Sequence, residues 1–259
     1  MTPFPPQSER SMIVTGDDFG LDSRVNEAVE RHFRAGLLTQ ASLMVNERGV
    51  EEAVRIARRN PGLKVGLHLS LCCGRASEPS ALTDRDGRFR PSPARAGLVY
   101  AFRPGLREAL GAEIARQFQR FAALGFSPVY WDGHTHLHLH PVVLELTLPH
   151  IGGFHAVRLV RVAGAGPLPV IFRLLSRAAH AKLPGVAATD HLFGFAETGR
   201  MGTRPLEILL ANTPRGQSEL YYHPGAEPAE PDFQLLRELI EMEGIRLISA
   251  ADLPTPAPL

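Results

Sequence analysis

The sequence has few cysteines and no long apolar run. Cys72 and Cys73 are the only cysteines, and they are adjacent. A disulfide between neighbours needs a strained geometry, so we expect two small apolar side chains, buried and unbridged, in preference to a disulfide or a metal-binding pair. No run of about 18 apolar residues could span a bilayer, and the first ten residues lack the apolar core of a secretion signal. A cytoplasmic, reducing location is predicted.

The sequence also lacks a block of basic residues. Its 28 lysines and arginines nearly balance 27 acidic residues, and the net charge is +1. Nucleic-acid binding needs a basic surface that neutralises phosphates, so nucleic acid is not an expected partner. With 259 residues, 44% of them hydrophobic, the chain is long enough to bury one large core.

Short apolar runs typical of strands alternate along the chain with longer segments typical of amphipathic helices. Strands are expected at 11–16, 39–45, 64–71, 127–134, 156–162, 188–195, 218–224 and 245–249, and helices at 22–36, 48–59, 106–125, 141–148, 168–182, 204–212 and 231–243. Such alternation favours a parallel sheet with crossover helices.

The first expected strand is not followed by the glycine-rich phosphate loop of an open dinucleotide-binding sheet. We therefore predict an α/β protein with one TIM-like (β/α) barrel of seven or eight strands over residues 11–250. Residues 72–105, rich in Pro, Gly and Arg, form an expected ordered insertion or lid. Residues 1–10 and 251–259 are expected to be frayed tails.

Polar residues occur where the first and third strands are expected to end. Asp17 and Asp18 follow an apolar strand, where two carboxylates are costly unless a cation balances them. A helix N-terminus is the alternative explanation, but Asp22 lies closer to the helix start. In the third strand, alternation places Gly66 and His68 on the inward face of a barrel. A lone strand histidine is more often a hydrogen-bonded core residue than a ligand.

The fourth strand leads into WDGHTHLHLHP, which contains His134, His136, His138 and His140. Imidazole is a common metal ligand, and alternate spacing on an extended chain would place the rings on one side. Solvated histidines at a helix start are the alternative. Strands one, three and four would thus bring a carboxylate and two imidazoles to the carboxyl-terminal rim, as a metal site requires. His223 ends a later strand and is either a turn residue or part of the same site.

The motifs VTGDDFG, GLHLSL, DGHTHLHLHP and YYHP, in this order, resemble those of the YdjC-like carbohydrate deacetylases over residues 11–247. That family includes chitooligosaccharide deacetylases and hopanoid-associated deacetylases. The stretches NEAVERHFRAGLLTQASLMVN, REALGAEIARQFQRFAALG and TDHLFGF resemble the hopanoid-associated branch more closely. The resemblance implies a NodB-like barrel and an enzyme that hydrolyses the linear amide of an N-acetylated amino sugar and releases acetate. It implies Asp18, His68 and His134 as metal ligands, Asp17 as general base and His223 as general acid.

This chain departs from the family pattern at two positions. Gly16 stands where Ala is usual, and Thr135 stands where some relatives have another histidine, which leaves the roles of His136 and His138 open. Further side chains expected around the metal or substrate are Asp132, His136, His138, Arg158, Asp190 and His191. Arg158 or Arg161 is expected either to pair with Asp17 or to form a surface salt bridge.

One divalent ion is expected as cofactor: Zn²⁺ or Mg²⁺, with Mn²⁺, Co²⁺ and Ni²⁺ also compatible. The expected substrate is an N-acetylglucosamine-containing oligosaccharide or glycolipid, including a lipid-linked one such as an N-acetylglucosaminyl hopanoid. Residues 167–185 combine apolar residues with Arg173, Arg177 and Lys182, which fits peripheral membrane contact, although an ordinary barrel helix is favoured. A homo-oligomer remains open.

Two other functions compete with this one. An amidohydrolase-type metallohydrolase acting on a different amide also uses histidine ligands in a barrel. Such enzymes typically carry His-x-His first and an aspartate late, the reverse of the order here. A non-catalytic metal- or sugar-binding barrel is the other alternative.

Overall fold

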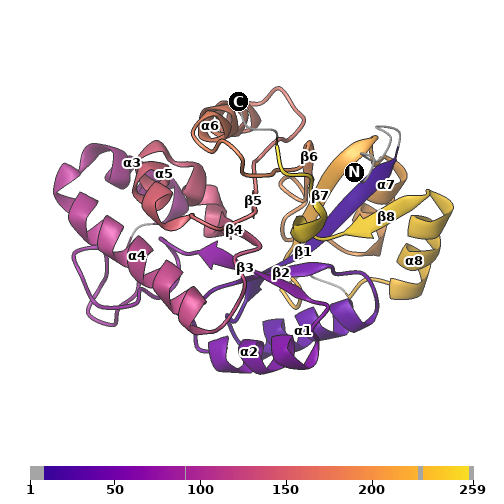
Figure 1. Ribbon diagram of the computed structural model, residues 1–259, viewed down its shortest axis with the longest axis horizontal. Helices are drawn as coiled ribbons and strands as arrows, with labels where there is room; N and C mark the ends of the chain where they lie inside the picture. Colours follow the sequence, from indigo (N-terminus) through magenta and orange to yellow (C-terminus); the bar gives the residue numbers. More distant parts are fainter. Residues whose placement is uncertain (1–8, 91, 227–229, 257–259) are drawn as a thin grey trace.

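The computed structural model describes residues 9–90, 92–226 and 230–256, and within them one curled parallel sheet with helices around its outside (Figure 1). The strands are β1 (Arg10–Phe19), β2 (Gln40–Leu43), β3 (Lys64–Leu69), β4 (Tyr130–Gly133), β5 (Ala156–Val157), β6 (His191–Phe193), β7 (Gly216–Tyr222) and β8 (Ile245–Ile248). The α-helices are α1 (Ser23–Arg34), α2 (Val50–Arg59), α3 (Pro93–Phe102), α4 (Arg107–Ala123), α5 (Pro141–Thr147), α6 (Pro167–Ala181), α7 (Thr203–Ala211) and α8 (Phe233–Met242). The predicted barrel-type α/β class is confirmed.

β1 is the longest strand and organises the sheet, whose order is β5-β4-β3-β2-β1-β7-β6. β7 pairs with residues 10–16 of β1. β8 pairs with residues 10–13 and β2 with residues 15–19. A strand has only two edges, so β8 and β2 share the edge of β1 opposite β7. The barrel therefore has seven strands in its main path and an eighth beside the first half of β1.

The ends of the curled sheet meet through irregular backbone rather than through a ladder. Val157 N–H donates to the Ala187 carbonyl at 2.9 Å, and Leu192 N–H donates to the Arg161 carbonyl at 3.1 Å. The fifth strand was predicted over 156–162, but only Ala156 and Val157 are strand. The extension is wrong because the chain turns just beyond, where Arg161 N–H donates to the carbonyl of Leu159, two residues earlier.

The sheet buries both of its faces. The outward face packs against the helices, whereas the interior of the barrel holds a smaller cluster that includes Ile13, Tyr130 and Ile248. Gly66 faces this interior, because a Cβ built there would lie 2.4 Å from the Tyr130 ring. The inward orientation predicted for this face of the third strand is thus confirmed at Gly66.

Residues 72–105 contain more regular structure than the sequence predicted. Isolated antiparallel bridges join Arg75 to Arg88 and Thr83 to Phe89, and α3 occupies the second half. Both cysteines are free, as expected, but Cys72 is buried and Cys73 is exposed. The expectation that both are buried is therefore wrong for Cys73.

The expected frayed tails fall partly outside the described residues, since residues 1–8 and 257–259 are not described. Arg10 begins β1, and the chain near the other end is anchored, because Leu253 is buried and its carbonyl accepts a hydrogen bond from His155 Nε2 at 2.8 Å. No helix within the described ranges is both long and apolar enough to cross a membrane.

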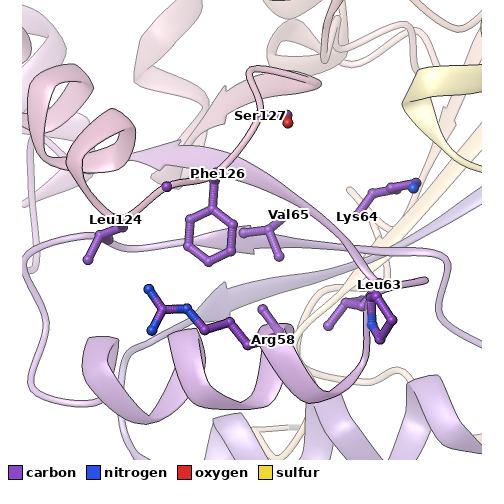
Figure 2. A pocket seen from close by; sticks show the side chains of 10 residues that line it. Arg58, Leu63, Lys64, Val65, Leu124, Phe126 and Ser127 are labelled. Carbon is purple, nitrogen blue, oxygen red and sulfur yellow. The ribbon is translucent and has the colours of Figure 1, made fainter.

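A hollow of about 330 Å³ lies at the amino-terminal end of the barrel, between α2 and the end of α4 (Figure 2). Leu63, Val65 and Phe126 line it, with Arg58 and Lys64 beside them. Lys64 and Val65 begin β3 and Phe126 precedes β4, so the hollow lies opposite the carboxyl ends of the strands, where barrel active sites form. Among the described residues, no carboxylate, histidine or cysteine lines it, and we assign it no chemistry.

Gly66→Ala tests the close approach of β3 to Tyr130. The added methyl group would overlap the Tyr130 ring, and overpacking of this kind typically costs about 1–3 kcal/mol of the free energy of unfolding. Chemical denaturation measures the loss. Gly105→Ala is the matched control, because its Cβ would meet nothing within 4 Å. Equal stability of the two variants would contradict the packing described here.

Candidate active site

Side chains from several strands converge at the carboxyl-terminal rim of the sheet. Asp17 and Asp18 lie near the end of β1, His68 near the end of β3, and His134 directly after β4. His223 follows β7. Because the strands are parallel, their carboxyl ends meet at one rim, and residues distant in the sequence become neighbours.

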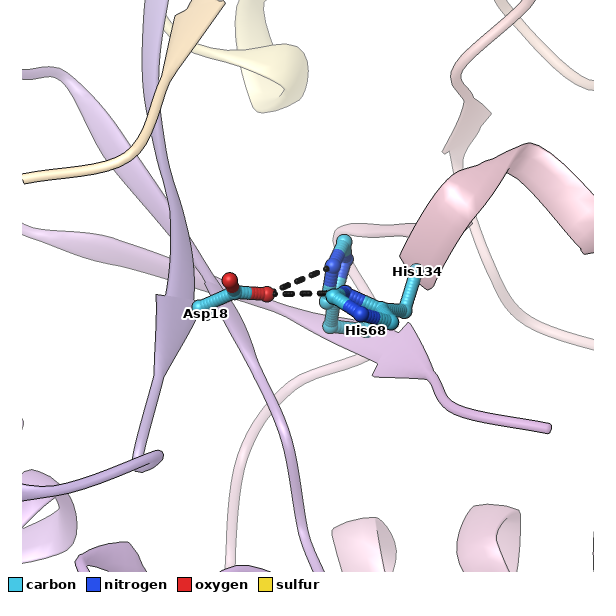
Figure 3. A group of neighbouring side chains, drawn as sticks. All are labelled: Asp18, His68 and His134. Carbon is cyan, nitrogen blue, oxygen red and sulfur yellow. Dashed lines mark hydrogen bonds and ion pairs between the residues drawn. The ribbon is translucent and has the colours of Figure 1, made fainter. Parts of the chain in front are cut away.

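Asp18, His68 and His134 form a compact cluster (Figure 3). Asp18 Oδ1 lies 3.0 Å from His134 Nδ1 and 3.3 Å from His68 Nε2. One ligand atom from each residue lies within 4.8 Å of the others. Asp18 has a φ of 62°, a left-handed conformation that is uncommon for a non-glycine residue and typical of functional sites. The geometry suits a single metal ion.

His68 is oriented as metal-binding histidines usually are. Its Nδ1 donates to Asp132 Oδ1 at 2.6 Å, and Ser42 donates to the other oxygen of Asp132 at 2.8 Å. The buried Nε2 has no hydrogen-bond partner among the residues that the structure describes, and it faces Asp18 Oδ1 at 3.3 Å. Metal-ligating histidines commonly donate their second nitrogen to a carboxylate in this way, so Nε2 is free to bind a metal ion.

The surrounding charges favour a cation at this position. Burial opposes protonation of His68, but the negative charges of Asp132 and Asp17 outweigh it and raise the pKa of His68 to about 10. Burial also disfavours ionised Asp18, yet its contacts with His134 and His68 hold its pKa well below the usual value. A bound divalent ion would satisfy this demand for positive charge in place of the proton.

Arg158 lies at the centre of the charged interior and is 2% exposed. Its Nη1 and Nη2 donate to the two oxygens of Asp17 at 2.8 and 2.9 Å. It also lies 2.9 Å from Asp132 Oδ2 and donates to Glu219 Oε1 at 2.9 Å. Of the two arginines considered from the sequence, Arg158 therefore contacts Asp17, whereas Arg161 donates to the Thr189 carbonyl.

Glu219 belongs to this network and was missed by the sequence analysis. Burial raises its pKa, although Arg158 opposes the shift. Strand alternation offered the signal, because Glu219 and Tyr221 share the face of β7 that leads to His223.

A cavity of about 250 Å³ opens beside the cluster. Its lining consists of Asp17, His68, Gly133, His134, Thr135, His136, Phe195, Thr198, Tyr221 and His223. His136 Nε2 lies 3.0 Å from the Tyr221 hydroxyl. The two expected proton-transfer residues, Asp17 and His223, thus line the same space as two of the three expected ligands.

The four clustered histidines do not point to one side, as an extended chain would require. Residues 134–139 form 3₁₀ turns, and Thr135 and His136 have φ values of 58° and 60°. His138 Nε2 instead donates to the Arg158 carbonyl at 2.8 Å, and burial lowers the pKa of His138 to about 4. His140 precedes α5. The expectation of rings on one face is wrong because the backbone turns directly after β4.

The structure does not bring Asp190 and His191 into the cluster. Asp190 is exposed and accepts a hydrogen bond from Gln217 N–H at 3.0 Å. His191 lines a different cavity. Both residues lie at the amino end of β6, whereas the cluster lies at the carboxyl ends of the strands.

Asp132→Asn tests the orientation of His68. The amide removes the negative charge from the group that accepts the His68 Nδ1 proton, and losses of this kind lower metal affinity roughly 10- to 100-fold. Calorimetric titration with Zn²⁺ measures the affinity. Asp190→Asn is the control, since that carboxylate lies outside the cluster. Unchanged zinc affinity in Asp132→Asn would show that Asp132 does not support the ligand.

A model of the YdjC-like protein family matches residues 11–246. A carbohydrate deacetylase from Brevibacillus brevis is 39% identical over 139 residues, which are 53% of this chain and 54% of that relative. The chain thus spans about half the length of this relative. A mouse carbohydrate deacetylase is 31% identical over 253 residues, covering 85% of this chain and 79% of the relative.

Among solved structures, a candidate cellobiose-phosphate cleavage protein from Enterococcus faecalis V583 superposes with a TM-score of 0.70. The match covers 94% of this chain and 98% of that protein at 19% identity. At this identity the likeness supports the fold alone.

Proposed function

We propose a function on one established premise: the chain belongs to the YdjC-like protein family. The proposed activity is metal-dependent hydrolysis of the N-acetyl group of an amino sugar, which releases acetate. The names of the two relatives above support carbohydrate deacetylation. The observation that carries the proposal is the cluster of Asp18, His68 and His134 beside the cavity that Asp17 lines.

The ligand set fits a divalent metal ion. One carboxylate and two imidazoles suit Zn²⁺, and they also permit Co²⁺, Ni²⁺, Mn²⁺ or, with several waters retained, Mg²⁺. When bound, the ion would supply Lewis-acid chemistry, which polarises an acetyl carbonyl and lowers the pKa of water.

Asp17 is the proposed general base. Arg158 contacts both of its oxygens and thereby fixes its orientation, while Asp17 still lines the cavity. It would accept a proton as water attacks the acetyl carbon. Although Asp18 is its neighbour in the chain, that carboxylate faces the histidines instead, so the two residues have separate tasks.

His223 is the proposed general acid. Gly16 of β1 is paired with Tyr222 of β7, so the next residues along these strands, Asp17 and His223, lie at adjacent positions on the rim. Both side chains line the same cavity. A protonated His223 would deliver a proton to the leaving nitrogen, which could not otherwise depart as an amine.

The proposed substrate is an N-acetylglucosamine-type oligosaccharide or glycolipid, and a lipid-linked form, such as a hopanoid, is the finer alternative. The position of α6 supports the lipid-linked form. This helix lies beside the cavity, because the ring centroid of its Phe172 is 5.6 Å from that of His136, which lines the cavity. The same helix exposes Leu168, Ile171 and Leu174 by 50–59%. These apolar side chains offer a surface beside the site to which a lipid could bind.

Asp17→Asn tests the general base. We expect acetate release to fall roughly 10²- to 10⁴-fold, because the amide cannot accept the proton. Metal content, measured by atomic absorption, should stay near that of the unmodified protein. Asp22→Asn is the control, since either residue caps α1 and turnover should persist. Near-normal turnover in Asp17→Asn would remove Asp17 from the role of base.

Metal removal and substrate choice are tested together. We expect acetate release from a chitobiose-type sugar or an N-acetylglucosaminyl lipid to disappear after chelation and to return with one of the five metals named above. Hydrolysis of a cyclic amide instead would favour the amidohydrolase alternative. If neither substrate released acetate with any of these metals, the protein would be a metal- or sugar-binding protein rather than a deacetylase.

A further inference from the structure

A second cavity, of about 510 Å³, lies between α6, the segment 161–163 and the start of β6. Five nitrogen-bearing side chains line it, namely Arg161, Arg173, Arg177, His180 and His191. No Asp or Glu lines the cavity within the described part of the chain. The three arginines therefore make the cavity positive, although the chain as a whole is nearly neutral.

Two of the arginines are held in place by backbone carbonyls rather than by carboxylates. Arg161 Nη1 donates to Thr189 at 2.7 Å, and Arg173 Nη1 donates to Val162 and Gly164 at 3.1 and 2.6 Å. A guanidinium has five N–H donors, so donors remain on both side chains. The arginines are thus oriented before any ligand arrives, which lowers the entropic cost of binding one.

Nothing in the described protein balances these positive charges at close range. Across residues 9–90, 92–226 and 230–256, no carboxylate lies within 4 Å of the Arg161, Arg173 or Arg177 guanidinium. Burial lowers the pKa of Arg161, and the charge of Asp190 opposes this shift only in part. Arg161 and Arg173 are partly buried, whereas Arg177 is exposed. Neighbouring cations that are partly buried are unfavourable unless an anion accompanies them, so the cavity favours a negatively charged ligand.

We propose that this cavity is a binding site for a phosphate group. Arginine forks match the oxygens of phosphate and form charge-assisted hydrogen bonds with them. The phosphate could be carried by a small sugar ligand or by the headgroup of an anionic lipid. The chemistry of the site is the same for both sources.

The phosphate site is distinct from the metal cluster, but α6, which lines it, also contacts His136 of the neighbouring cavity through Phe172. The Phe172 and Phe195 rings lie 5.2 Å apart, and both contact His136. Arg173, the next residue of α6, lines the phosphate cavity. A phosphate bound there would lie beside the acetyl-hydrolysing site rather than in it, and its binding does not depend on the proposed activity.

Arg177→Gln and Arg58→Gln form a matched pair of variants. Both arginines are exposed on helices and each lines a cavity, but Arg58 lines the separate hollow between α2 and the end of α4 (Figure 2). Calorimetric titration of the metal-loaded protein with inorganic phosphate should give saturable binding. We expect Arg177→Gln to raise the Kd for phosphate about tenfold, because the variant loses one charge-assisted hydrogen bond to the anion. Arg58→Gln should leave the Kd unchanged. Absent saturation, or equal effects of the two variants, would overturn the proposal.

Phosphate could also bind a metal ion directly, and Asp18→Asn separates this case. The substitution removes a proposed metal ligand and should abolish acetate release, but we expect phosphate affinity to persist. Loss of phosphate binding in Asp18→Asn would place the anion at the metal cluster and contradict a site beside α6. Failure of the phosphate site and failure of the proposed activity are therefore separate outcomes.

Competition identifies the source of the phosphate. An N-acetylhexosamine phosphate and vesicles of phosphatidylglycerol would each be titrated against bound inorganic phosphate, with phosphatidylcholine vesicles as the control. Displacement by the sugar phosphate alone supports a soluble ligand, and displacement by phosphatidylglycerol but not phosphatidylcholine supports an anionic lipid. Displacement by neither would indicate an adventitious ion only and would overturn the proposal.

Discussion

The ion pairs around Arg158 fix the charged interior of the barrel. One buried guanidinium contacts carboxylates from three strands: Asp17 of β1, Asp132 of β4 and Glu219 of β7. Charges withdrawn from water require such partners, and removing one member of a buried pair typically costs about 3–5 kcal/mol. The network therefore holds the three carboxylates in fixed positions inside the barrel. Apolar packing around Tyr130 and Ile248 fills the neighbouring part of the interior.

The same network orients the candidate metal ligands. Asp132 is shared between Arg158 and His68 Nδ1, so the direction of His68 Nε2 depends indirectly on the arginine. The left-handed backbone at Asp18 then separates two adjacent carboxylates. Asp17 faces Arg158, and Asp18 faces the two histidines. Neighbours in the sequence thus acquire different partners and, in the proposed reaction, different roles.

The sequence predicted the elements whose periodicity is strong and failed where tertiary contacts decide. The alternating helices and strands and the inward face of β3 followed from apolar spacing. α3 was missed because residues 72–105 are rich in Pro, Gly and Arg, and β5 is shorter than predicted because of the turn at Leu159–Arg161. Strand alternation places Glu219 on the same face of β7 as Tyr221, but only the folded structure reveals its contact with a guanidinium 61 residues earlier in the chain.

The sequence by itself determined the fold class and the order of the polar motifs, because hydrophobic periodicity and strand ends are local properties of a chain. Only the tertiary structure decided which of these residues meet. It turned His138 toward the Arg158 carbonyl and left Asp190 outside the cluster. It also gathered Arg161, Arg173 and Arg177 around one cavity. The physical reason is that charge pairing and burial depend on distances in space, which the closure of the parallel sheet sets and local sequence does not encode.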